Sequence, residues 1–126
     1  MESPDGRRTV IKRDYREIRM GSPLFGQVRV EGGHARTGSR DFGEAMAFSP
    51  DSRYLAIDEI VGVTRDGGPH TRVVVFDLEL EKEYVVHDEQ GGLIHEVSWS
   101  VEGDLSVVSW RQPEGEIEHR DIWRPR

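Results

Sequence analysis

AMAFSPDSRYLAI at residues 45–57 opens the stretch that decides the fold, and TRVVVFDLE (71–79) and KEYVVH (82–87) complete it. Pro50 presets φ for the first corner of a turn, and Asp51 can hydrogen-bond to the backbone two residues further on. Residues 73–76 are β-branched or aromatic, which is typical of a strand buried on both faces. The stretch at 45–89 therefore predicts short strands separated by tight turns.

This succession of strands and turns resembles one blade of a β-propeller of the WD40 or TolB type. The resemblance rests on the FSPD turn at 48–51, the LAI strand that follows it, and the VVFDL strand at 74–78 before a short hairpin. It covers about the last two-thirds of the chain. It implies antiparallel blade-like sheets and says almost nothing about activity.

A second, incomplete copy of the pattern follows at residues 94–124. Three positions recur at offsets of 51, 50 and 47 residues, namely Phe48 and Trp99, Leu55 and Leu105, and Phe76 and Trp123. Such near-constant spacing indicates an internal repeat. The second copy ends after its third strand, and the propeller resemblance suggests that residues 9–20 supply the missing outer strand.

The length of 126 residues limits the architecture. A closed propeller needs about four to eight blades of roughly 40–50 residues each. We therefore expect one all-β domain of about nine strands, with antiparallel sheets that resemble two propeller blades and do not form a closed propeller. Its expected parts are a loose N-terminus (1–8), N-terminal strands and a loop (9–44), a first blade-like unit (45–89) and the second unit (94–124).

The strand expected at residues 9–20 has a helical alternative, because Ile11, Tyr15 and Ile18 also follow helical spacing. The β-branched residues at 9–11 favour the strand. A further strand is expected at residues 24–31, followed by a glycine-rich loop at 32–40.

The composition limits the cellular location and the kinds of binding partner that we expect. The chain has no cysteine and a net charge of −7, and no apolar run suggests a secretion signal or a membrane span. We expect a soluble, cytoplasmic protein that binds neither membranes nor nucleic acids, because an acidic surface repels phosphate and attracts basic partners.

The sequence shows no catalytic or metal-binding motif. The five histidines lack i, i+4 spacing, and no Gly-x-Ser-x-Gly motif is present. Ser49 and Ser100 fall at the turns, where a hydroxyl commonly caps the chain. We therefore expect no enzymatic activity, cofactor or metal, and histidines exposed on strand edges.

The strongest charge feature lies at residues 77–89, which hold six acids and one lysine. Alternation predicts that Leu78 and Leu80 face one way while the acids between them face the other. An exposed tryptophan beside an arginine, Trp110-Arg111, is a common pairing at protein interfaces. The candidate partner-binding residues are Asp77, Glu79, Glu81, Glu83, Asp88, Glu89, Trp110 and Arg111.

These observations predict a non-enzymatic protein-binding module. Its size and charge are similar to those of small acidic immunity proteins, which bind and neutralise a cognate, often basic, bacterial toxin or effector. The alternative is a two-blade subunit that forms a homo-oligomer, closes a propeller ring, and binds a small ligand or sugar in its channel.

Overall fold

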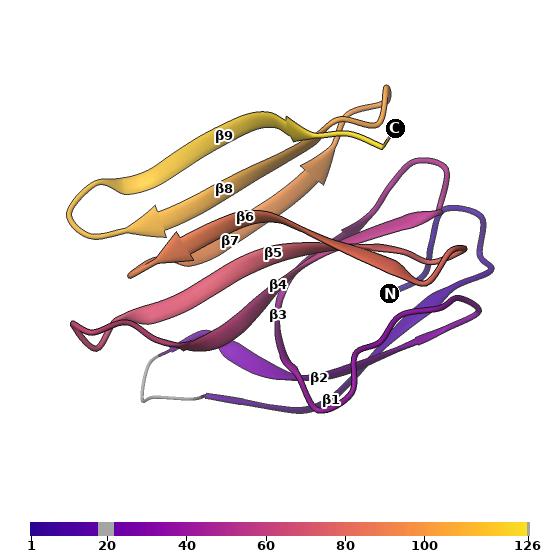
Figure 1. Ribbon diagram of the computed structural model, residues 1–126. Coiled ribbons are helices and arrows are strands. Elements are labelled where there is room, and N and C mark those ends of the chain that lie inside the picture. The colour runs from indigo at the N-terminus through magenta and orange to yellow at the C-terminus, as the bar shows by residue number, and fades with distance from the viewer. Residues whose placement is uncertain (18–21, 126) are drawn as a thin grey trace.

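The computed structural model describes residues 1–17 and 22–125, which contain nine strands (Figure 1). The strands are β1 (Thr9–Glu17), β2 (Leu24–Glu31), β3 (Asp41–Phe48), β4 (Tyr54–Val63), β5 (Pro69–Asp77), β6 (Lys82–Gln90), β7 (Leu93–Trp99), β8 (Leu105–Arg111) and β9 (Gly115–Trp123). The all-β prediction is confirmed, and β1 is the strand expected at 9–20 as far as Glu17. The rest of that expected strand lies outside the described residues. No helix in the described chain has the length and apolar character needed to cross a membrane.

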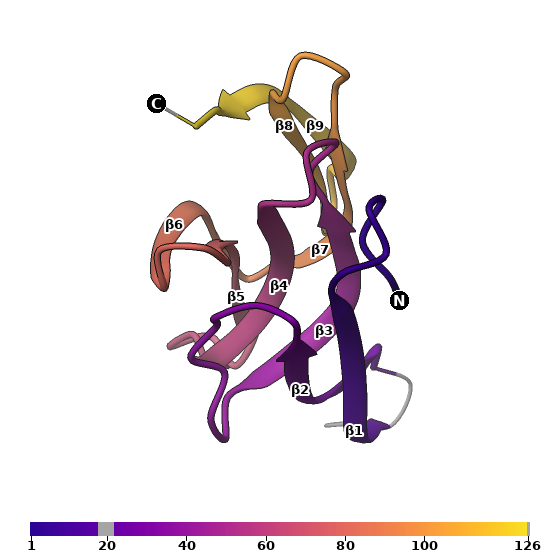
Figure 2. The same ribbon diagram turned by 90° about the vertical axis from the view of Figure 1, so that its right-hand side faces the viewer.

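Within the described residues the strands form two antiparallel sheets, β1–β6 and β7–β9, and neither closes on itself. Figures 1 and 2 show β7–β9 lying over β3–β6, with the β1–β2 hairpin on the other side. Within the described residues, strands β2 and β3 are joined by one residue pair, Gly26 with Phe42. The larger sheet bends at this short ladder, since few main-chain hydrogen bonds hold the two strands side by side. The β1–β2 hairpin can therefore fold across one face of β3–β6.

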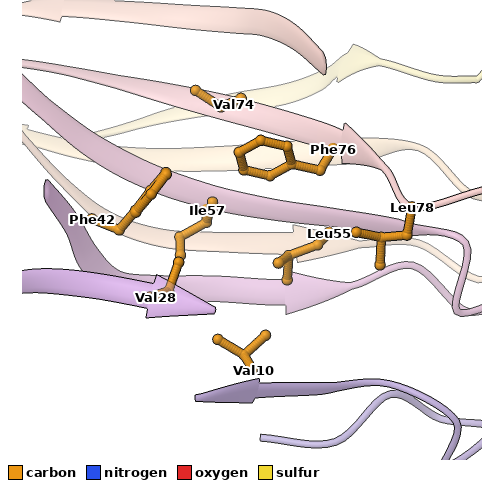
Figure 3. Packing of buried hydrophobic residues seen from close by; sticks show 8 residues of the cluster. All are labelled: Val10, Val28, Phe42, Leu55, Ile57, Val74, Phe76 and Leu78. Atoms are coloured by element: carbon orange, nitrogen blue, oxygen red, sulfur yellow. The ribbon is translucent and has the colours of Figure 1, made fainter. Parts of the chain in front are cut away.

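Strands β4 and β5 are buried on both faces, so their side chains build two cores. One face packs against β1 and β2, through a cluster formed by Val10, Val28, Phe42, Leu55, Ile57, Val74, Phe76 and Leu78 (Figure 3). The other packs against the smaller sheet, through Tyr54, Ala56, Val73, Val75, Ile94, Val97, Leu105 and Val107. The prediction that residues 73–76 form a strand buried on both faces is confirmed.

Strands β3–β5 and strands β7–β9, which stack on each other, share one pairing register. Phe48 pairs with Leu55, which pairs with Phe76. Trp99 likewise pairs with Leu105, which pairs with Trp123. The residues that recur in the sequence thus occupy equivalent ladder positions, whereas the resemblance to a propeller blade stays a prediction.

Two expectations for the N-terminal region are wrong. Strand β1 pairs with β2 and does not complete the β7–β9 sheet. Residues 1–8 are not loose, because the Ser3 N–H donates to the Arg8 carbonyl and the Asp5 N–H donates to Ser52 Oγ, at 2.9 and 3.0 Å. The Arg8 guanidinium also donates to the Ser52 carbonyl at 2.6 Å, which ties this segment to the β3–β4 turn.

We expect Trp99→Ala to destabilise the protein by about 3 kcal/mol, at the low end for loss of a core tryptophan because the ring is half-buried. The Trp99 ring packs on Tyr54 and Trp123, and its indole N–H donates to the Ala47 carbonyl at 2.9 Å. Urea unfolding monitored by circular dichroism measures the loss. Trp110→Ala is the matched control, because that ring is 40% exposed. Equal stability of the two variants would contradict the role of Trp99 in joining the sheets.

Candidate functional site

Two of the predicted partner-binding acids are buried. Asp77 is 2% exposed; it pairs with Arg53 at 3.0 Å and accepts hydrogen bonds from the backbone N–H groups of Glu79 and Leu80. Glu89 is 1% exposed and pairs with Arg111. Contrary to the prediction, neither carboxylate offers an unpaired charge to a partner, because each one is already paired with an arginine of the same chain.

The other four acids lie at the surface, but each has a cationic or histidine neighbour. Glu79 lies 3.5 Å from Arg53, Glu81 lies 3.2 Å from Arg36, Glu83 lies 3.0 Å from Arg40, and Asp88 lies 2.7 Å from His70. Exposed pairs of this kind contribute little to stability. They nevertheless neutralise most of the acidic run at residues 77–89, so it is a weaker attractor than the sequence implies.

The predicted alternation of residues 77–81 is wrong. Leu78 is fully buried in the first core, whereas Leu80 is 56% exposed. The reason is that the chain turns here, as the positive φ of 54° at Glu81 shows, so the period of a strand does not apply.

Trp110 and Arg111 do not form a joint surface. Trp110 is 40% exposed, as predicted, whereas the Arg111 side chain reaches the buried Glu89. Adjacent residues of a strand point to opposite faces, so a partner that covers Trp110 does not meet the Arg111 guanidinium from the same side.

The structure brings together a set of side chains that the sequence analysis did not select. Strands β6 and β9 are edge strands of the two sheets, and no ladder joins them in the described residues. Ring contacts join them, with centroid distances of 5.4 Å between Tyr84 and Trp123 and 4.4 Å between His87 and His119. We call the facing residues Tyr84, His87, Glu89, His119 and Trp123 the seam.

A β-bulge in β6 sets which residues face the seam. Val85 pairs with Val74 and His87 pairs with Val73, which leaves Val86 as an extra residue in the ladder. The bulge reverses the alternation, so His87 lies on the same side of the sheet as Tyr84. Strict alternation along β6 would place these two residues on opposite faces, and for this reason the sequence did not reveal the seam.

The polar end of the seam contains two histidines and one carboxylate. His87 Nε2 lies 3.0 Å from Glu89 Oε1, and Ser109 Oγ lies 3.1 Å from His119 Nε2. The potential ligand atoms of His87, Glu89 and His119 all lie within 4.8 Å of one another. The expectation that histidines lie exposed on strand edges is therefore wrong for His87 and His119. The short spacing His87-x-Glu89 is the signal that the sequence offered, because residues i and i+2 of a strand share a face.

The electrostatics of this polar end come from burial and pairing. Burial raises the pKa of Glu89, but hydrogen bonds from Arg111, His87 and Ser109 outweigh it and hold that pKa below its usual range. Burial and the neighbouring His87 lower the pKa of His119, which favours a neutral ring. The polar end thus combines an ionised carboxylate with a neutral imidazole.

The other end of the seam opens into a groove between the sheets, which we call the aromatic groove. It has a volume of about 640 Å³ and is lined by Arg53, Tyr54, Asp77, Leu80, Lys82, Tyr84, Asp104, Asp121, Ile122, Trp123, Arg124 and Pro125. The Trp123 ring lies 5.7 Å from Tyr54 and 5.4 Å from Tyr84, centroid to centroid. The pairs Arg53–Asp77 and Arg124–Asp104 line it as well, at 3.0 and 2.6 Å. Aromatic faces bordered by fixed charges suit a polypeptide ligand.

Comparisons with protein-family models, with curated proteins and with solved structures each gave no match to this chain.

Proposed function

We propose that the chain is a non-enzymatic protein-binding module that holds an extended segment of a partner in the aromatic groove. The observation that supports this most is the meeting of three aromatic rings, Tyr54, Tyr84 and Trp123, at one open groove. Aromatic residues are enriched at the energetic centres of interfaces, where they bury large area at small entropic cost.

Strand β6 supports the same proposal from the backbone side. In the described chain it pairs with β5 on one side only. An extended segment can add a strand to such an edge and gain main-chain hydrogen bonds. Leu80, Tyr84 and Val85 along this edge are 56%, 39% and 53% exposed. A partner strand would cover apolar surface while its side chains reach the groove.

The net charge favours a basic partner. Complementary charge speeds encounter, which suits an inhibitor that must capture a damaging protein quickly. The particular function that we propose is a small acidic immunity or inhibitor protein that neutralises a basic bacterial toxin or effector. Because the acids at 77–89 are paired internally, the attraction comes from the overall charge rather than from that run.

The test is capture of a partner by the tagged protein from its own host, followed by light scattering of the eluate. We expect one stoichiometric basic protein. Tyr84→Ser should weaken its binding by about 30-fold, the loss typical of a hot-spot residue. Val63→Ser is the matched control, because Val63 is 64% exposed but lies in β4, outside the lining of the groove and the β6 edge.

Three outcomes would contradict parts of this proposal. Equal affinity of the Tyr84→Ser and wild-type proteins would remove the aromatic groove as the binding site. Unchanged affinity at low salt after reversal of Glu79, Glu81 and Glu83 to lysine would exclude attraction by the overall acidic charge. A symmetric homo-oligomer without a partner would favour the assembled propeller.

A further inference from the structure

The polar end of the seam has the composition of a transition-metal site. His87 and Glu89 come from β6 and His119 comes from β9, so the three groups join the edges of two sheets. Glu89 is 1% exposed and both histidines are half-buried. Two imidazoles and one carboxylate form the ligand set of several zinc sites in proteins, in which water takes the fourth position.

The distances suit a zinc ion after a small local movement. Zinc binds histidine nitrogen and carboxylate oxygen at about 2.0–2.2 Å, which places tetrahedral ligand atoms roughly 3.3 Å apart. His87 Nε2 and Glu89 Oε1 already lie 3.0 Å apart. The full set lies within 4.8 Å, so rotation of the His119 ring and a small approach of β9 toward β6 would complete the triangle.

The Arg111 guanidinium occupies the position beside Glu89 that a metal ion would take. It pairs with the buried carboxylate, yet its own buried Nε has no hydrogen-bond partner among the described residues. The Arg111 side chain is 40% exposed, so it can move into solvent without crossing the core. A divalent ion would then replace one positive charge on Glu89 with two.

We propose that His87, Glu89 and His119 bind one Zn²⁺ ion, or a divalent transition-metal ion of similar preference, which crosslinks β6 to β9. Binding displaces Arg111 from Glu89. This site lies at the opposite end of the seam from the aromatic groove, and it does not depend on the partner-binding function.

The test is titration of chelator-treated protein with Zn²⁺ by calorimetry, together with the visible spectrum of the Co²⁺-substituted protein. We expect one ion per chain and the intense absorption of tetrahedral cobalt. His119→Asn should weaken binding by at least about 100-fold, since loss of outer partners alone costs 10- to 100-fold. His95→Asn is the matched control, because His95 also lies beside a carboxylate, Glu116 at 3.4 Å, but outside the seam.

Arg111→Met separates a metal site from a merely structural cluster. Without the guanidinium, Glu89 is a buried and uncompensated charge, so the metal-free variant should melt at a lower temperature than wild type. Zn²⁺ should then raise its melting temperature by more than it raises that of wild type, because no internal cation competes. A structural cluster would show the first effect without the second.

Zinc binding of equal strength in the wild-type, His119→Asn and His87→Asn proteins would overturn the proposal. So would a cobalt spectrum that shows only octahedral, solvent-like bands. If His119→Asn fails to fold, the cobalt spectrum of wild type and the zinc response of Arg111→Met still decide the question.

Discussion

Phe76→Ala is expected to destabilise the protein by about 3–5 kcal/mol, a large part of the total stability of about 5–15 kcal/mol typical of a domain. The ring is 2% exposed and meets Phe42 edge to face at a centroid distance of 6.0 Å. Arg40 lies over both rings, with its guanidinium carbon 5.2 Å and 5.4 Å from their centroids. Removing Phe76 therefore opens a cavity and also removes one of the two rings beneath a cation.

Urea unfolding monitored by circular dichroism measures this loss. Val85→Ala is the matched control, since Val85 lies in the neighbouring strand and is 53% exposed, and we expect it to change stability by less than about 0.5 kcal/mol. A Phe76→Ala protein as stable as Val85→Ala would contradict the packing of the first core.

Asp58→Asn is expected to be more stable than wild type, by a free energy of unfolding that grows as pH rises. Asp58 is 3% exposed, and burial raises its pKa to about 7, although the Ala45 N–H donates to its Oδ1 at 3.0 Å. There is no room for a cation to approach from β3, because a Cβ built on Gly43 would lie 2.1 Å from Asp58 Oδ2. The carboxyl group is thus held in a tight site beside the β-bulge of β3 between Phe42 and Met46, where no described residue forms an ion pair with it.

The sign of the effect follows from the direction of the pKa shift. The folded protein keeps a proton on Asp58 up to about pH 7, whereas the unfolded chain loses it near 3.8. The contribution of Asp58 to stability is therefore greatest below the unfolded pKa and is lost as pH rises through that window. A rise in pKa from 3.8 to about 7 corresponds to roughly 4 kcal/mol.

Urea unfolding of wild type and Asp58→Asn at several pH values tests this prediction. Asparagine keeps the acceptor for the Ala45 N–H and cannot ionise, so the stability difference between the proteins isolates Asp58. We expect this difference to grow by roughly 3 kcal/mol between pH 5 and pH 8. Parallel stability curves for the two proteins would show that Asp58 is not buried in the uncharged form.

The sequence predicted the elements of this fold well, because strand signals are local. The run at residues 24–31 is β2 in full, and the run at 73–76 is the doubly buried part of β5. The offset between Phe48 and Trp99 reflected a shared register. Each of these inferences needed only side-chain type and spacing within one segment or its repeat.

The candidate site could not be predicted in the same way, because it depends on pairings between distant segments. The acids Glu81 and Glu83 looked unpaired, but Arg36 and Arg40 reach them from the loop before β3. His119 joins His87 only when the two sheets stack. The bulge at Val86, which changes the face of the strand, leaves no mark in composition or charge.

The order of the strands has a consequence for how the chain folds and how it can change. Each strand of either sheet pairs with the strand next to it in sequence. Closing such short loops costs little entropy, so pairing can spread from one hairpin to the next. The long-range step is the docking of β7–β9 onto β3–β5, which aromatic contacts such as Tyr54 with Trp99 accompany. A chain arranged in this way can gain or lose a hairpin at either end during evolution without rethreading the others.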